Sequence, residues 1–179
     1  MGLGITAIVE RWPVAGQFII SRGAKEHVDV LLVAVSDGRH YGMGEGTAIY
    51  YHGESAELCL MQVEGVIDQL AELDVRAARE AVQKILHPGA ARNALDCALW
   101  DLEAKAAGVP LWQLVGLAQE PKPLQTAFTI SLGEPATMEA DAAGAAARGF
   151  SLLKLKLTGE GDRERVSAVR KGAPAARMI

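Results

Sequence analysis

The sequence predicts an α+β domain followed by the beginning of a parallel α/β unit, in a chain of 179 residues. Strand-like segments open the chain and helical segments follow them, which is typical of α+β domains. After about residue 121 strands and helices alternate, and this alternation indicates a parallel sheet. Half of the residues are hydrophobic and 22% are charged, so a sizeable core is expected.

The first strands are predicted at residues 3–10 and 28–35, which are rich in β-branched and aliphatic side chains. Asp37-Gly38-Arg39-His40 is typical of a hairpin turn, and a further strand should begin at Tyr41. Gly42 to Gly46 lacks the spacing of a phosphate-binding loop, and we interpret this glycine-rich run as a strand that ends in a turn.

Three helices are predicted next. Apolar residues recur at helical spacing from Ser55 to Leu70, and a second helical run spans residues 77–86 before His87-Pro88-Gly89. The clearest helix spans residues 91–107 and ends at Gly108 and Pro110.

Predicted strands and helices alternate regularly in the second half of the chain. Strands are predicted at 126–132 and 152–157, helices at 135–148 and 162–171, and a third strand within 175–179. Parallel strands are buried on both faces, and a sheet of two or three would leave unpaired edges. We therefore expect the sheet to continue in a larger domain.

Charge and cysteine content narrow the class of protein. The formal net charge is -4 and no basic run stands out, so no nucleic-acid partner is expected. Cys59 and Cys97 lie far apart, which favours neither a zinc site nor a disulfide and fits a reducing cytoplasm. Neither a signal peptide nor a long apolar span is evident, so no membrane partner is expected.

Lys154 and Lys156 are the strongest candidates for chemistry. Side chains alternate along a strand, so both lysines should lie on one face and Leu153, Leu155 and Leu157 on the other. If that face is enclosed, repulsion and desolvation favour a neutral lysine that can act as a base. The alternative is an edge strand whose lysines lie in solvent.

Two further side chains are candidates for the same cavity. Thr129, on the preceding predicted strand, could direct its hydroxyl there, although a strand threonine is more often structural. Arg22, in a loop between two strands, could bind a substrate carboxylate with both guanidinium nitrogens, or be a solvated loop residue.

Three segments resemble the dipeptide epimerases of the enolase superfamily: residues 92–102 (RNALDCALWDL), residues 126–132 (TAFTISL) and Lys154-Leu155-Lys156. The loops around Ile20–Gly23 and Gly44–Ser55 are similar to the substrate-covering loops of that family's capping domain. The resemblance implies a capping domain at residues 1–118, then the first two β/α units of a (β/α) TIM-type barrel at 119–179, in a truncated chain.

The resemblance also implies a reaction and its residues. Mg²⁺ held by three carboxylates would stabilise the enediolate formed when a base removes the α-proton of an L-amino-acid dipeptide. Lys156 would be the acid/base and Lys154 its support, while Thr129 and Arg22 would line the dipeptide site. The resemblance implies a dipeptide such as Ala-Glu, but Tyr50 and Tyr51 stand where Ala-Glu epimerases commonly carry a loop with proline and arginine. The two tyrosines could therefore favour a hydrophobic or aromatic dipeptide, or be exposed loop residues without a function.

Several points stay open at this stage. The metal ligands and the second catalytic lysine are expected beyond Ile179, so the 179-residue chain alone should be inactive. The alternatives are a related enzyme, such as muconate cycloisomerase or o-succinylbenzoate synthase, and a non-catalytic truncated remnant. The sequence leaves a homo-oligomer open.

Overall fold

The chain forms two compact units, Met1–Trp12 with Val28–Pro121 and Pro13–His27 with Lys122–Ile179. The computed structural model describes residues 2–20 and 23–179, and its side chains outside 16–25. Each unit encloses its own cluster of buried apolar residues. No helix among the described residues combines the length and apolar character needed to cross a membrane.

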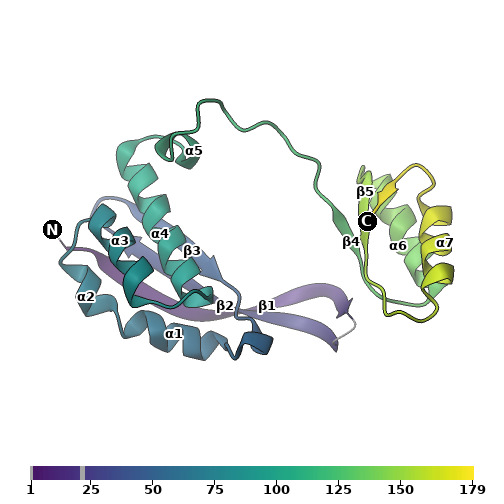
Figure 1. Ribbon diagram of the computed structural model, residues 1–179, viewed down its shortest axis with the longest axis horizontal. Helices are drawn as coiled ribbons and strands as arrows, with labels where there is room; N and C mark the ends of the chain where they lie inside the picture. The colour runs from purple at the N-terminus through teal and green to yellow at the C-terminus, as the bar shows by residue number, and fades with distance from the viewer. Residues whose placement is uncertain (1, 21–22) are drawn as a thin grey trace. The chain divides into compact units, whose positions relative to one another are not determined.

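A three-stranded sheet in the order β1-β2-β3 opens the chain (Figure 1). Its strands are β1 (Gly4–Ile20), β2 (Gly23–Ser36) and β3 (Tyr41–Gly46). The pairing of β2 with β3 is antiparallel, from Leu31 opposite Gly46 to Ser36 opposite Tyr41. The predicted hairpin turn is confirmed. The first two strands extend well beyond the segments predicted for them.

Helices follow the sheet. They are η1 (Tyr50–His52, a 3₁₀ turn), α1 (Ala56–Glu64), α2 (Ile67–Ala71), α3 (Val75–Ile85), α4 (Ala90–Ala107) and α5 (Leu111–Leu114). The prediction of one helix from Ser55 to Leu70 is wrong, because α1 ends at Glu64 and the Val66 N–H bonds to the Val63 carbonyl, only three residues back, before α2 begins. Ser55 begins α1 by accepting the Leu58 N–H at 3.2 Å.

The glycine-rich run of β3 is a packing surface for α4. Gly42, Gly44 and Gly46 lie on the buried face of the strand, and a Cβ on any of them would collide with the α4 backbone at Ala98, Ala94 or Ala90. Two residues of strand and four of helix advance the chain by similar distances, about 6 to 7 Å. Glycines spaced by two and alanines spaced by four therefore stay in step along the interface.

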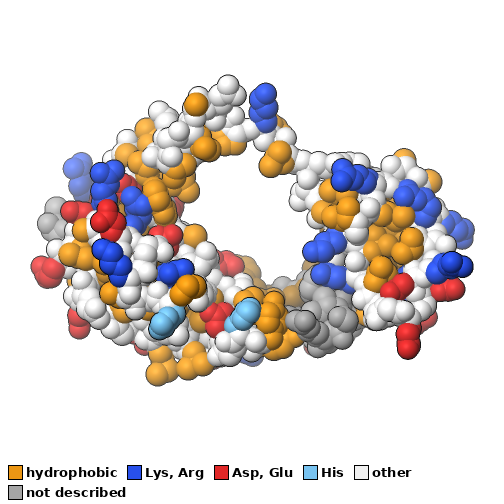
Figure 2. Space-filling view, in the orientation of Figure 1, with side chains coloured by type: hydrophobic (Ala, Val, Ile, Leu, Met, Phe, Trp, Pro, Cys, Tyr) orange, Lys and Arg blue, Asp and Glu red, His pale blue; other side chains and the backbone are white. Residues whose placement is uncertain are grey.

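Charged side chains are interspersed over the outer helices of this unit (Figure 2). Between α3 and α4, the Arg79 guanidinium lies 3.4 Å from the Trp100 ring centroid, and its Nε donates to Glu103 Oε2 at 2.6 Å. These contacts attach α3 to the outer side of α4.

Within the second unit, residues 122–179 form a βαβαβ segment with a parallel sheet in the order β4-β5-β6. Its elements are β4 (Phe128–Ile130), α6 (Pro135–Ala147), β5 (Leu152–Leu155), α7 (Asp162–Gly172) and β6 (Arg177–Met178). Both helices lie on one face of the sheet (Figure 1). The predicted third strand is confirmed. β5 lies between two strands, so the alternative that the lysines sit on an edge strand is wrong.

Candidate active site

The two faces of the parallel sheet differ in character. Ile130 and Leu153 are buried at 1% and 0% exposure, and they pack with Met138 and Val169 of the two helices. Thr129 of β4 is in register with Lys154 of β5. Residues in register on neighbouring strands share a face, so Thr129 and Lys154 lie together on the face away from the helices.

Lys156 extends this polar face by one step. It follows the last residue of β5, and its backbone N–H donates to the Ile130 carbonyl of β4 at 3.2 Å. The pairing of the two strands thus continues through Lys156, and the alternation of side chains places it on the same side as Lys154. Lys154 is exposed and Lys156 is half-buried. The structure therefore groups Thr129, Lys154 and Lys156.

Tyr50 and Tyr51 form a second group, in the first unit. Both lie in η1 and are 54% and 59% exposed, with their rings edge to face at a centroid distance of 5.2 Å. The Tyr51 ring also lies 4.9 Å from the His52 ring. The turn thus presents an aromatic surface to solvent. Arg22, the remaining predicted binding residue, lies outside the described residues.

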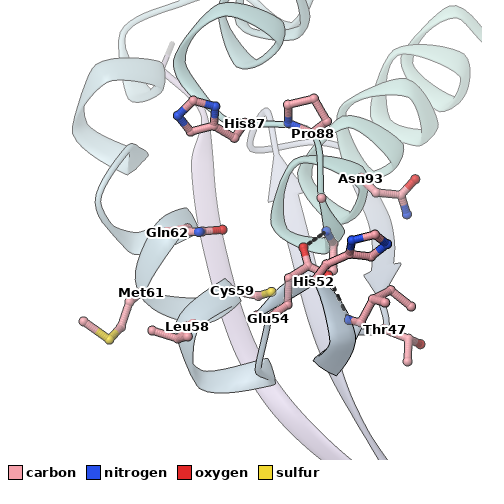
Figure 3. Close-up of a pocket in the computed structure, with 14 residues that line it drawn as sticks. Thr47, His52, Glu54, Leu58, Cys59, Met61, Gln62, His87, Pro88 and Asn93 are labelled. Atoms are coloured by element: carbon pink, nitrogen blue, oxygen red, sulfur yellow. Dashed lines mark hydrogen bonds between the residues drawn. The ribbon is translucent and has the colours of Figure 1, made fainter.

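A half-open cavity of about 860 Å³ lies beside this turn, and Figure 3 shows its lining. Glu54 sits at its inner edge and accepts two backbone N–H groups at 2.8 Å, from Ile49 to Oε2 and from Ala90 to Oε1. Gly89 precedes α4 and has no side chain that could cap the helix. The Glu54 carboxylate therefore caps α4 and connects the helix to the residue before the aromatic turn.

Sequence reasoning missed the role of Glu54. The Gly53-Glu54-Ser55 segment was assigned to a substrate-covering loop only by resemblance. Its partner Ala90 is 36 positions away, so no local pattern joins the two residues. The available signal was Gly89 as the residue before a helix, because glycine there leaves the first N–H groups in need of an acceptor.

The cysteines and acidic residues do not build a metal centre in the described part of the chain. No group of three His, Cys, Asp or Glu side chains there could hold a metal ion. Burial raises the pKa of the Cys59 thiol, and the nearby Glu54 charge raises it further. Burial also raises the pKa of Cys97, with the Asp96 charge adding to it. Both thiols are therefore poor ligands and nucleophiles near neutral pH.

Comparison with known proteins gives one family for the first unit. The family model for the N-terminal domain of mandelate racemase and muconate lactonizing enzyme matches residues 3–116. The L-Ala-D/L-Glu epimerase of Escherichia coli K12 is 38% identical over 170 residues, which are 95% of this chain and 52% of that protein. The chain spans about half the length of the curated relatives it matches.

Solved structures give the same result over nearly the whole chain. An enolase family member from Agrobacterium tumefaciens, crystallised with sodium and L-Ala-L-Glu, has a TM-score of 0.89 at 44% identity over 99% of this chain and 52% of that one. The dipeptide epimerase of Enterococcus faecalis V583, complexed with Mg and L-Leu-L-Tyr, has a TM-score of 0.87 at 27% identity, again over 99% and 52%. The chain thus has the fold of a capping domain followed by the start of a barrel.

Proposed function

Because the chain belongs to the mandelate racemase/muconate lactonizing enzyme family, we propose that the complete protein is a dipeptide epimerase of the enolase superfamily. Its reaction would move a proton on and off the α-carbon of an L-amino-acid dipeptide. Two of these relatives support this activity, since the E. coli protein and the E. faecalis protein are both dipeptide epimerases.

The observation that carries the proposal is the polar face formed by Thr129, Lys154 and Lys156. It lies at and just beyond the carboxyl ends of two parallel strands, the end of such sheets where barrels bind their substrates. Lys154 is exposed and faces away from the apolar cluster between the sheet and the helices, so it has no role in that core. Packing does not explain why two lysines share this face, whereas proton transfer to and from a substrate would.

In this proposal Lys156 acts as the base. Its neutral amine takes the proton as the α C–H bond breaks, and the electron pair remains on the substrate as the enolate of its carboxylate. Lys154 adds positive charge beside the charge that develops, and the Thr129 hydroxyl positions the substrate. Return of a proton on the opposite face would yield the epimer, and it requires a second acid outside this chain.

Substrate recognition is assigned to Thr129, Arg22 and the aromatic turn. Arg22 would pair with a carboxylate of the dipeptide, and Tyr50 and Tyr51 would contact its side chain. An Ala-Glu dipeptide is supported by the bound ligand of the A. tumefaciens protein. A hydrophobic or aromatic dipeptide is supported by the exposed tyrosines and by L-Leu-L-Tyr in the E. faecalis enzyme.

Mg²⁺ is proposed as the cofactor of the complete protein, in line with the Mg of the E. faecalis enzyme. The described residues do not fit such a site, since they contain no suitable group of ligands. We therefore expect the 179-residue polypeptide by itself to be inactive.

The test is α-proton exchange in D₂O, after intact mass has shown whether the purified protein exceeds the 19.0 kDa of this chain. A longer protein with Mg²⁺ should replace the α-proton of L-Ala-L-Glu or L-Leu-L-Tyr by deuterium, followed by proton NMR. Lys156→Ala should slow exchange by about 100-fold or more.

Lys171→Ala is the matched control, because Lys171 is an exposed lysine on α7 paired with Glu139 at 2.8 Å. Exchange that persists in Lys156→Ala would remove the assigned base. No exchange with any dipeptide, together with turnover of a muconate or o-succinylbenzoate precursor, would replace the epimerase by one of those enzymes.

A further inference from the structure

The loop that follows Lys156 is hydrogen-bonded to the carboxylate of Asp162. Residues 157–161 contain Gly159 and Gly161, whose positive φ angles of 101° and 66° belong to a region that favours glycine. Asp162, the first residue of α7, accepts the Thr158 N–H at 3.1 Å and the Gly159 N–H at 2.7 Å. The loop leaving Lys156 is therefore bonded back onto the start of the next helix.

Arg165 joins this loop to the loop after β4. Its Nη1 donates to Asp162 Oδ1 at 3.2 Å and also contacts the Glu160 carbonyl. Its Nε donates to the Gly133 carbonyl, in the loop between β4 and α6, at 3.1 Å. The Arg165 and Asp162 side chains are only 18% and 22% exposed. One rigid guanidinium thus connects the segments that follow both strands of the candidate site.

We infer that Asp162 and Arg165 are positioning residues, which set the direction of Lys156 relative to Thr129 and the substrate. The inference rests on the proposed function. Lys156 is the residue between β5 and the bonded loop, so a shift of that loop moves the lysine directly. A displacement of about 1 Å at a reacting group costs on the order of 100-fold in rate.

The pair is separable from the packing of α7. The buried residues of this helix are Ala168 and Val169, and Val169 belongs to the core cluster of the unit. Arg163, two positions before Arg165, is exposed, and no hydrogen bond or ion pair of its side chain occurs among the described residues. Arg163→Met is therefore a matched control for Arg165→Met on the same turn of helix.

The experiment measures α-deuterium exchange in the longest natural polypeptide that carries this chain, with Mg²⁺ and the dipeptide it exchanges best. Arg165→Met should lower kcat by about 10- to 100-fold with KM nearly unchanged, while Arg163→Met keeps both constants. Arg165→Lys should stay impaired, because an ammonium cannot reach both loops. Asp162→Asn combined with Arg165→Met should cost less than the sum of the two.

A role in stability alone would lower thermal stability and leave kcat intact at temperatures where the variant is folded. That result, or equal kcat in Arg165→Met and Arg163→Met, would overturn the inference and leave the proposed function standing. If Arg165→Met does not fold, Arg165→Lys tests the inference instead, because the same reduction of kcat is expected for it. A wild-type protein without any exchange would overturn both.

Discussion

Single carboxylates determine several local geometries in this protein. Asp37 holds the β2–β3 turn by accepting the N–H groups of Arg39 and His40 at 2.8 and 2.7 Å. The turn was predictable from four adjacent letters, because an aspartate that accepts N–H groups two and three residues ahead needs no distant partner. The Glu54 carboxylate and the Arg165 guanidinium also bond backbone groups, but these partners lie 36 and 32 positions away. No local sequence pattern indicates such contacts.

The Asp37 carboxyl should titrate at unusually low pH. The N–H groups of His40 and Arg39, and then the His40 ring, lower its pKa from 3.8 to about 2. Because the folded pKa is depressed, its contribution to stability is complete above 3.8 and is lost as pH falls toward about 2. Carboxyl-carbon NMR should give a midpoint near 2, and Asp37→Asn should remove this pH dependence of stability. A midpoint near 3.8 would contradict the turn geometry.

Glu54 should stabilise the first unit and the aromatic turn together. Glu54→Ala leaves the half-buried N–H groups of Ile49 and Ala90 without their acceptor, at a cost of about 1 to 3 kcal/mol. Chemical denaturation measures this loss. Glu57→Ala, at an exposed position on α1, should change stability by less than about 0.5 kcal/mol. An equal loss of stability in the two variants would show that the Glu54 hydrogen bonds do not stabilise the first unit.

Whole elements were predicted where their signals are local. α4 has helical periodicity over five turns and a Gly108 that ends it with a φ of 68°, and its observed bounds differ from the prediction by one residue. The single helix predicted from Ser55 to Leu70 was wrong because the apolar spacing continues across the turn between α1 and α2, with Val63, Val66 and Leu70 all buried in one core. The spacing of apolar residues indicates which face of a segment is buried. It does not show that the segment is one continuous helix.

Two glycines, Gly44 at the interface of β3 with α4 and Gly144 within α6, give stability predictions of opposite sign. Gly44→Ala would place a methyl group against the Ala94 carbonyl and should destabilise the protein by about 2 kcal/mol or more. Gly144→Ala, within α6, meets no atom within 4 Å and should stabilise by about 0.5 to 1 kcal/mol through helix propensity. Thermal unfolding monitored by circular dichroism checks both, and a neutral Gly44→Ala would mean that helix and strand can separate.

At the scale of the molecule, the two buried clusters share no residue. Leu99→Ala should therefore destabilise the first unit and Leu153→Ala the second, each by about 2 to 5 kcal/mol, since both side chains are fully buried. Hydrogen exchange followed by mass spectrometry can assign each loss to its own peptides. A loss of protection over both units in each variant would indicate one cooperative core.

The domain boundary at residue 118, between the capping domain and the barrel, stays a prediction.

The sequence by itself determined the order of the strands, the helices α3, α4, α6 and α7, the change from antiparallel to parallel architecture near residue 121, and the shared face of Lys154 and Lys156. These follow from periodicity and turn residues, which act between neighbours a few positions apart. Only the tertiary structure decided that β5 lies between two strands, that Thr129 is in register with Lys154, and that Glu54 and Arg165 join distant segments. The physical reason is that strand order, register and long-range hydrogen bonds depend on which surfaces meet, and residues far apart in the chain carry no local pattern for that choice.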